Sequence, residues 1–176
     1  MTVGTRRILV KEVTSLFELK PGVIEEADLV ASGMTLPQQQ QHPVSKGTVE
    51  NEIEAPPFKY PKEELNAPVG LVIHMLGLIV RYLGIKLPFL IFHKETRPYI
   101  RMIPPNTPQL WDNYNKMPLF LEEDDKNFKR FVIGMAMLNY NLAYLCYTQN
   151  VKIPLSQVAN TLQSLMACCR APNLGL

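Results

Sequence analysis

An apolar stretch from Leu65 to Gly84 constrains the fold more than any other part of this sequence. From Val69 onward apolar residues occupy nearly every position around a helix, and only His74 and Arg81 interrupt them. A membrane span needs roughly 20 predominantly apolar residues, and this run is shorter and contains two polar side chains. The stretch is therefore interpreted as the central, buried helix of a soluble domain.

Both ends of this helix carry recognisable signals. Asn66 is a suitable N-cap, with Pro68 in the first turn, where its missing N–H costs little. Gly84 followed by Ile85 predicts a left-handed C-terminal cap with a hydrophobic contact behind it.

Composition excludes some classes of protein. A net charge of +2 is too small to indicate a nucleic-acid partner. The three cysteines, Cys146, Cys168 and Cys169, have no CxxC spacing, so free thiols in a reducing setting are expected rather than disulfides or a zinc site. Residues Met1 to Phe17 lack the apolar region of a signal peptide, which predicts a cytoplasmic chain.

The N-terminal third predicts a helix, a strand and an insert. Apolar residues spaced for one helix face occur between Thr5 and Leu19, namely Leu9, Val13, Leu16 and Phe17. Asp28 to Leu36 fits a strand, and residues 37–61 are rich in Gln and Pro and predict a disordered insert. We expect an amphipathic helix over 1–20, whose abrupt start is compatible with the end of a longer coiled coil, and one α+β domain over 21–176 with the insert near 37–61.

The remaining elements alternate between strands and helices. Lys86 to Ile103 predicts a hairpin around a polar turn, and Pro118 to Leu121 a further short strand. A helix from about Lys126 to Gln149 should bury residues at helical spacing and end near Asn150; they are Phe128, Phe131, Val132, Met135, Leu138, Leu142 and Leu145. A last helix after Pro154 has an apolar stripe opposite an uncharged polar face. The stripe comprises Leu155, Val158, Ala159, Leu162, Leu165 and Met166, and the polar face Gln157, Asn160, Thr161, Gln163 and Ser164. The class is α+β, with short strands packed on two long buried helices.

Catalytic signatures are missing from the sequence. It contains no P-loop, HExxH helix or GxSxG elbow. His74 is better explained as a hydrogen-bonded core histidine than as a catalytic base, and Cys146 as a small buried hydrophobe. The carboxylates of Glu122 to Asp125 are typical of a solvated helix start and lack the spacing of a calcium loop. The sequence indicates neither an enzyme nor a cofactor or metal.

Two interaction surfaces remain as hypotheses. Trp111 lies in a proline-rich loop and is either tucked beneath it or inserted into a partner or a membrane. Lys94, Arg97 and Arg101 form a modest positive patch that is either solvated surface or a contact for anionic lipid. The last helix could sense lipid packing or dock on its own domain. If the domain binds a protein, an exposed apolar strip should persist after its two long helices are packed.

Several stretches resemble one family. They are Arg6 to Leu9 with Leu16 and Phe17, Val80 to Pro88, His93 to Pro98, and Leu138 to Gln149. Together they are similar to the C-terminal half of the family of autophagy-related protein fourteen, which includes Barkor and the UV-radiation-resistance-associated protein. The autophagy members, above all the fungal ones, match best at Tyr82 to Pro88 and Leu145 to Gln149.

The resemblance implies a non-catalytic, autophagy-specific subunit of the class III phosphatidylinositol 3-kinase complex. It implies partners: a Beclin-type subunit, the catalytic subunit and its regulatory protein-kinase-like subunit. It further implies a cytoplasmic, peripheral membrane location at the phagophore assembly site, and a fold like the sheet-and-helix repeat of the Beclin C-terminus. The family's cysteine pairs and heptads are missing here, so zinc binding and coiled-coil pairing do not carry over. The alternatives are the endosomal or vacuolar-sorting paralogue, or an unrelated membrane-surface module.

Overall fold

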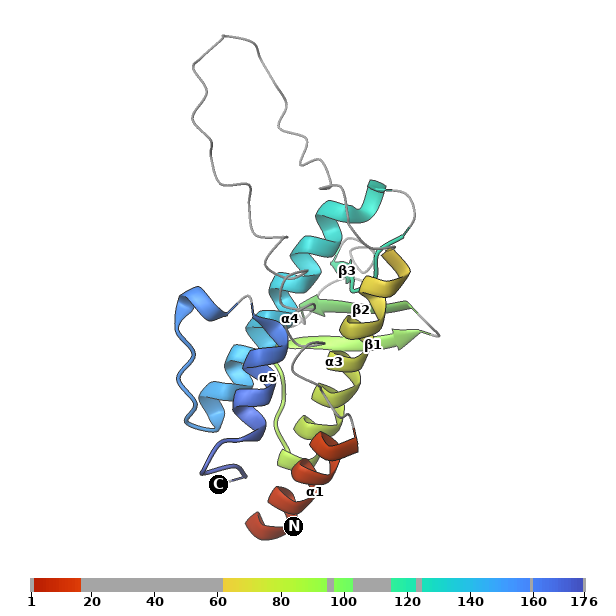
Figure 1. Cartoon of the computed structure of the whole chain (residues 1–176). Coiled ribbons are helices and arrows are strands. Elements are labelled where there is room, and N and C mark those ends of the chain that lie inside the picture. Colours follow the sequence, from red (N-terminus) through yellow and green to blue (C-terminus); the bar gives the residue numbers. More distant parts are fainter. Residues whose placement is uncertain are drawn as a thin grey trace.

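The computed structural model describes residues 2–16, 62–94, 97–102, 115–122, 125–158 and 160–175. The predicted strand at Asp28 to Leu36, the insert at 37–61 and Trp111 lie outside these ranges. The described part is a mixed α+β arrangement of four α-helices and a three-stranded antiparallel sheet (Figure 1). In chain order the elements are α1 (Val3–Leu16), α3 (Lys62–Leu83), β1 (Phe89–Lys94), β2 (Arg97–Met102), β3 (Lys116–Pro118), α4 (Phe128–Thr148) and α5 (Thr161–Cys169), with short 3-10 turns at Asp125–Asn127 and Leu155–Gln157.

Helix α3 provides the central core, as the sequence predicts. Ile73, Met75, Leu76 and Ile79 are almost completely buried and belong to one cluster with residues of α1, the sheet, α4 and α5. By length and composition alone, Asn66–Leu83 is long and apolar enough to cross a membrane. In the fold it packs beside α1 and α5 instead.

Of the two predicted caps of α3, the C-terminal one is confirmed and the N-terminal one is wrong. At Gly84, φ is +69°, and the N–H of Ile85 donates to the carbonyl of Val80 at 3.0 Å, which confirms the predicted left-handed cap. The predicted N-cap is wrong, because α3 begins at Lys62 and Asn66 lies inside it. The Asn66 side chain instead makes two hydrogen bonds with the backbone of Leu121.

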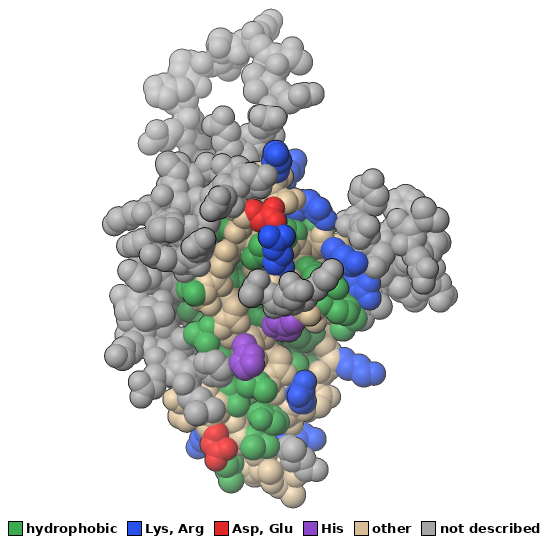
Figure 2. Space-filling model, turned by 90° about the vertical axis from the view of Figure 1, so that its right-hand side faces the viewer, with side chains coloured by type: hydrophobic (Ala, Val, Ile, Leu, Met, Phe, Trp, Pro, Cys, Tyr) green, Lys and Arg blue, Asp and Glu red, His purple; other side chains and the backbone are tan. Residues whose placement is uncertain are grey.

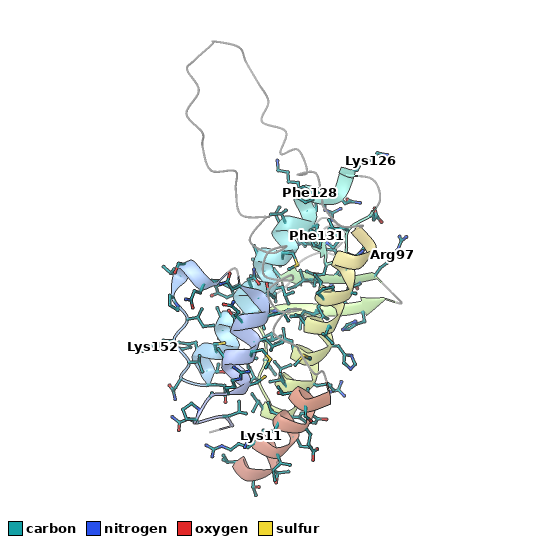
Figure 3. All side chains as sticks on the ribbon, viewed as in Figure 1. Lys11, Arg97, Lys126, Phe128, Phe131 and Lys152 are labelled. Carbon is teal, nitrogen blue, oxygen red and sulfur yellow. The ribbon has the colours of Figure 1, made fainter. Side chains whose placement is uncertain are left out.

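Helix α4 agrees closely with its predicted range. Phe131, Leu138, Leu142 and Leu145 are at most 1% exposed, and Val132 alone of the predicted set is only half-buried. Phe131 points into the molecule between α4 and its neighbours (Figure 3). The predicted end of the helix near Asn150 is also confirmed, because α4 ends at Thr148 and Asn150 has a left-handed φ of +57°.

The hairpin forms as predicted, with Lys94 paired to Arg97 across the turn. The third strand is Lys116–Pro118 rather than Pro118 to Leu121, although the N–H of Leu119 continues the pairing by donating to the carbonyl of Pro98 at 2.9 Å. Helix α4 lies on the inner side of the sheet, where Ile100 is fully buried.

The prediction for the last helix is wrong in two respects. A 3-10 turn and a break precede α5, so Leu155 lies outside it and is 93% exposed. Thr161 and Ser164 are buried, although the sequence places them on a polar outer face. The reason is that α5 packs against α4, α3 and α1 together, so more than one of its faces is covered. Leu162 and Leu165 are buried as predicted.

Candidate functional site

The outward face of the sheet carries cations and aromatic rings. Successive strand residues point to opposite sides, and the side that holds Ile100 is buried. The opposite side of β2 therefore presents Arg97, Tyr99 and Arg101. The register places Phe92 of β1 opposite Tyr99, and Lys116 of β3 opposite Arg101. These five residues are called the outer sheet face.

Ring and cation contacts order the outer sheet face. The rings of Phe92 and Tyr99 stack with centroids 5.1 Å apart. The Arg101 guanidinium lies over the Phe92 ring at 4.5 Å, and the Lys116 ammonium lies 5.5 Å from the Tyr99 ring. A cation near an aromatic face is attracted by the ring's quadrupole. These contacts hold long side chains in fixed positions, which lowers the entropic cost of binding a partner.

The outer sheet face carries three cationic side chains, those of Arg97, Arg101 and Lys116. Arg97 is paired with Glu122 at 3.5 Å, but its own side chain is 70% exposed, so the pair is weak. Among the described side chains, the only acidic ones are Glu12 and Glu122. Figure 2 shows several Lys and Arg side chains on one face of the described part of the molecule.

The predicted site residues are brought together only in part. Arg97 and Arg101 lie on one strand face, as the patch hypothesis requires. Lys94 lies on the paired strand β1, but its side chain and all of Trp111 are outside the described part of the structure. Sequence analysis did not single out Tyr99, Phe92 and Lys116 as site residues, since only the register shows that they join this patch.

An exposed aromatic strip lies on α4. Ile133, Tyr140, Tyr144 and Tyr147 are 43%, 56%, 37% and 78% exposed, and they recur at spacings that place them along one side of the helix. We call them the α4 strip. Tyr140 is partly anchored, because its ring meets the Phe89 ring edge-on at 5.5 Å. The strip persists although both long helices are packed, as a protein-binding domain would require.

The groups considered for catalysis do not form a site in the described residues. His74 is exposed, so its interpretation as a core histidine is wrong; it lies on the outward side of α3 rather than on the side of Ile73. Cys146 is fully buried, as predicted, and its thiol donates to the carbonyl of Ser164 at 3.2 Å. Within the described residues, no group of three or more His, Cys, Asp or Glu is placed to hold a metal.

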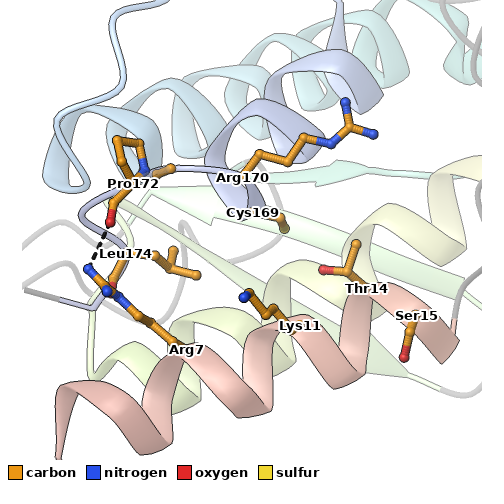
Figure 4. Close-up of a pocket in the computed structure, with 9 residues that line it drawn as sticks. Arg7, Lys11, Thr14, Ser15, Cys169, Arg170, Pro172 and Leu174 are labelled. Carbon is orange, nitrogen blue, oxygen red and sulfur yellow. Dashed lines mark hydrogen bonds between the residues drawn. The ribbon is translucent and has the colours of Figure 1, made fainter.

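Sequence analysis missed a basic pocket between α1 and the end of α5 (Figure 4). Its volume is about 550 Å³. The lining comprises cations, hydroxyls and apolar groups, namely Arg7, Lys11, Thr14, Ser15, Cys169, Arg170, Ala171, Pro172 and Leu174. Arg7 and Arg170 are far apart in the chain, so no local spacing could have indicated the pocket.

These features define a small mixed α+β protein with an ordered cationic and aromatic sheet face and an exposed aromatic strip. A family model described as vacuolar sorting 38 and autophagy-related subunit 14 matches residues 1–171. The chain belongs to this family, whose members are non-catalytic subunits of the phosphatidylinositol 3-kinase complex. No significant match was found among curated proteins or among solved structures.

Proposed function

We propose that this chain is the autophagy-specific subunit of the class III phosphatidylinositol 3-kinase complex and acts mainly by docking to a protein partner. Family membership supports a subunit of this complex. The autophagy assignment rests on the resemblance at Tyr82 to Pro88 and Leu145 to Gln149. The rival is the sorting paralogue of the same kinase.

The α4 strip carries the docking proposal. Tyrosine is enriched among the residues that dominate binding energy in protein interfaces, because it presents a large ring and a polar hydroxyl. Tyr144 and Tyr147 both stand within Leu138 to Gln149, which resembles the family, and Tyr147 also stands within the shorter stretch that resembles the autophagy members. The proposed partner is the Beclin-type subunit, within an assembly that also holds the catalytic and protein-kinase-like subunits.

A pull-down with the purified Beclin-type subunit tests the docking. Tyr144→Ser with Tyr147→Ser should weaken capture by about tenfold or more, since exposed aromatic anchors often contribute about 2 kcal/mol or more. The matched control is Ile8→Ser with Leu155→Ser, which removes apolar side chains that are 59% and 93% exposed on other elements. Equal loss in both variants would contradict a role for the α4 strip.

Membrane contact is the competing interpretation of the surface. Arg97→Gln with Arg101→Gln, and separately Trp111→Ala, should leave capture of the partner intact if docking uses the α4 strip alone. The same variants are tested for flotation with neutral, highly curved vesicles. Flotation of the unmodified chain without any partner, lost in Trp111→Ala, would favour the membrane interpretation over protein docking.

Complementation separates the two paralogues. The chain is expressed in cells that lack either the autophagy-specific subunit or the sorting subunit, and autophagosome formation and vacuolar sorting are measured. Our proposal predicts restored autophagosome formation at the phagophore assembly site. Restored sorting without autophagy would assign the chain to the rival paralogue.

A further inference from the structure

Strand β1 lies at the edge of the sheet, because β2 pairs with it on one side only (Figure 1). Its pairing with β2 runs residue for residue from Phe89 to Lys94 without a bulge. The strand contains no proline, and its single charged residue, Lys94, is the last one. Proteins usually protect an edge with prolines, bulges or charges, since its unpaired N–H and carbonyl groups are a template for another strand. The edge of β1 is therefore open to an added strand.

The hydrogen-bond pattern shows which residues of β1 face away from the sheet. In an antiparallel pair, the N–H and carbonyl groups of successive residues point alternately toward the partner strand and away from it. The carbonyl of Pro98 accepts from Leu119 on the β3 side, so Pro98 and the opposite residue, His93, do not hydrogen-bond to each other. By alternation, Phe89, Ile91 and His93 direct their backbone groups outward from the edge.

Asn141 agrees with this direction and occupies the first outward position. Its side-chain amide bonds to the N–H and to the carbonyl of Phe89, at 3.0 and 2.9 Å. The described part of the chain provides no comparable partner for the outward groups of Ile91 and His93, and His93 is exposed. Each of these two residues offers one donor and one acceptor. An extended segment can pair with both.

Cationic side chains flank this edge on the outer sheet face. The Arg101 guanidinium lies over the Phe92 ring at 4.5 Å, so a charge carried by β2 reaches over β1. Arg97 and Lys116 lie on the same face, where Glu122, one of the few acidic side chains that the structure describes, is paired with Arg97 at 3.5 Å. A strand added to β1 would place every second side chain on this face. Carboxylates at those positions would complement the cations.

The other face of an added strand would meet apolar and aromatic groups. Helix α4 crosses the inner side of the sheet from β3, which Gly134 approaches closely, to the edge of the sheet, where Asn141 bonds to Phe89. Tyr144 comes almost one turn later, so it lies beyond the edge. Ile91 is half-buried and belongs to the inner side of β1, because it stands opposite Ile100. Apolar side chains suit this face.

We infer that the edge of β1 binds an extended acidic segment of a protein partner, which pairs with Ile91 and His93 as an added strand. Its carboxylates face the side of Arg101, and its alternate, apolar side chains face Ile91 and Tyr144. A second copy of this chain fits less well. Symmetric pairing of two β1 strands about Phe92 would bring two Arg101 side chains together, and like charges repel. The inference does not depend on the proposed subunit assignment, because it uses the edge and its charges alone.

The test is calorimetric titration of the whole chain with a capped peptide that alternates glutamate and valine, Glu-Val-Glu-Val-Glu-Val-Glu. The control peptide has lysine in place of each glutamate and keeps the same tendency to be extended. The acidic peptide should bind at least about tenfold more tightly than the basic one, and more weakly as salt is raised. Equal affinities, or no binding of the acidic peptide to the folded chain, would overturn the inference.

N-methylation of the acidic peptide tests the added strand itself. A methyl group removes an amide donor, and in an extended peptide the amides of alternate residues face the same side. One peptide is methylated at its valine amides and another at its glutamate amides. One of the two should lose at least about tenfold in affinity, and the other should bind within about threefold of the unmethylated peptide. Equal effects of both would contradict pairing with an edge.

His93→Pro blocks the edge on the chain itself. The N–H of His93 faces outward, so proline removes a donor to the added strand without removing a bond to β2, and edge strands tolerate proline in this orientation. The variant should bind the acidic peptide at least about tenfold more weakly. His93→Ala keeps the N–H and should bind within about twofold. Melting temperatures confirm that both variants are folded, and equal affinities of the two would overturn the inference.

The charge and the alternative occupant are tested separately. Arg101→Gln should weaken binding of the acidic peptide by about threefold or more, whereas Arg81→Gln, at an exposed position on α3, should leave it unchanged. Equal losses would contradict charge complementarity at the edge. Sedimentation that finds a dimer of the unmodified chain and a monomer of His93→Pro would assign the edge to a second copy instead. The titrations contain no Beclin-type subunit, so their failure is distinct from failure of the docking proposal.

Discussion

Asn141 and Phe89 are joined by two hydrogen bonds that tie the middle of α4 to the first residue of β1. The Asn141 amide donates to the Phe89 carbonyl at 2.9 Å, and the Phe89 N–H donates to the Asn141 oxygen at 3.0 Å. Asn141 is fully buried, so its amide satisfies backbone groups of Phe89 that a neighbouring strand would otherwise pair. Asn66 forms the same kind of pair with Leu121 at 3.0 and 2.6 Å.

Replacing Asn141 with Leu should lower the free energy of unfolding by about 2–4 kcal/mol, because the variant leaves a half-buried N–H and a half-buried carbonyl of Phe89 unpaired. Urea denaturation followed by circular dichroism measures the change. Asn173→Leu, at an exposed position, is the control and should stay within about 0.5 kcal/mol. An equally small change for Asn141→Leu would show that water or a shifted strand replaces its contacts.

Gly134 allows α4 to approach β3 closely. A Cβ added there would lie 2.5 Å from the backbone oxygen of Pro118, so Gly134→Ala should force the helix and strand apart and cost about 1–3 kcal/mol. Gly77→Ala is the matched control, since nothing lies within 4 Å of that exposed helical position. Alanine there should stabilise the chain by about 0.5–1 kcal/mol. Opposite signs in thermal melts would confirm the close approach.

The sequence predicts individual helices, strands and caps better than it predicts the tertiary contacts around them. Gly84 and the hairpin were predictable because a left-handed cap and a polar turn between β-rich runs depend on nearby residues. The roles of Asn66 and Ser164 were not predictable. Asn66 has capping chemistry, yet its partner Leu121 is distant in the sequence, so a tertiary contact takes the place of a cap. Ser164 is polar, yet packing from several helices covers it.

The candidate site was likewise predictable only where it depends on residues close together in the sequence. Arg97 and Arg101 could be grouped from strand alternation alone, whereas Lys116 joins them only through pairing between β2 and β3. The basic pocket depends on residues from opposite ends of the described chain, such as Lys11 and Arg170. No residue spacing within a single sequence indicates that two such distant residues line the same pocket.

Asn150 holds the left-handed position that ends α4, with φ of +57°. The N–H of Val151 donates to the carbonyl of Cys146 at 2.8 Å, and the N–H of Asn150 to that of Tyr147 at 3.0 Å, so two helix-end carbonyls are satisfied. Asn150→Val should cost about 1–2 kcal/mol, because a β-branched residue resists this conformation. Asn150→Gly should be neutral or slightly stabilising in the same melts. A similar loss in both variants would instead assign the effect to the Asn side chain.

The cysteines supply a pH-dependent prediction. All three thiols are free and buried. A hydrogen bond with Cys146, followed by burial, raises the pKa of Cys168, and burial raises the pKa of Cys169. In the unfolded chain both thiols return to an ordinary pKa near 9.0. At these two thiols the folded state thus holds the proton more tightly than the unfolded state, whereas the hydrogen bond with Cys168 lowers the pKa of Cys146 and acts in the opposite sense.

The sign of the effect follows from this difference. Stability from a group with a raised folded pKa is complete below the unfolded pKa and is lost as pH rises above it, so the chain should weaken above about pH 9. Each such thiol contributes up to about 1.4 kcal/mol per pH unit. Urea denaturation from about pH 8 to about pH 10.5 should show this decline, and Cys168→Ala or Cys169→Ala should make it shallower, with lysines and tyrosines unchanged between chains. An identical slope in the parent and both variants would mean that other groups dominate the alkaline loss.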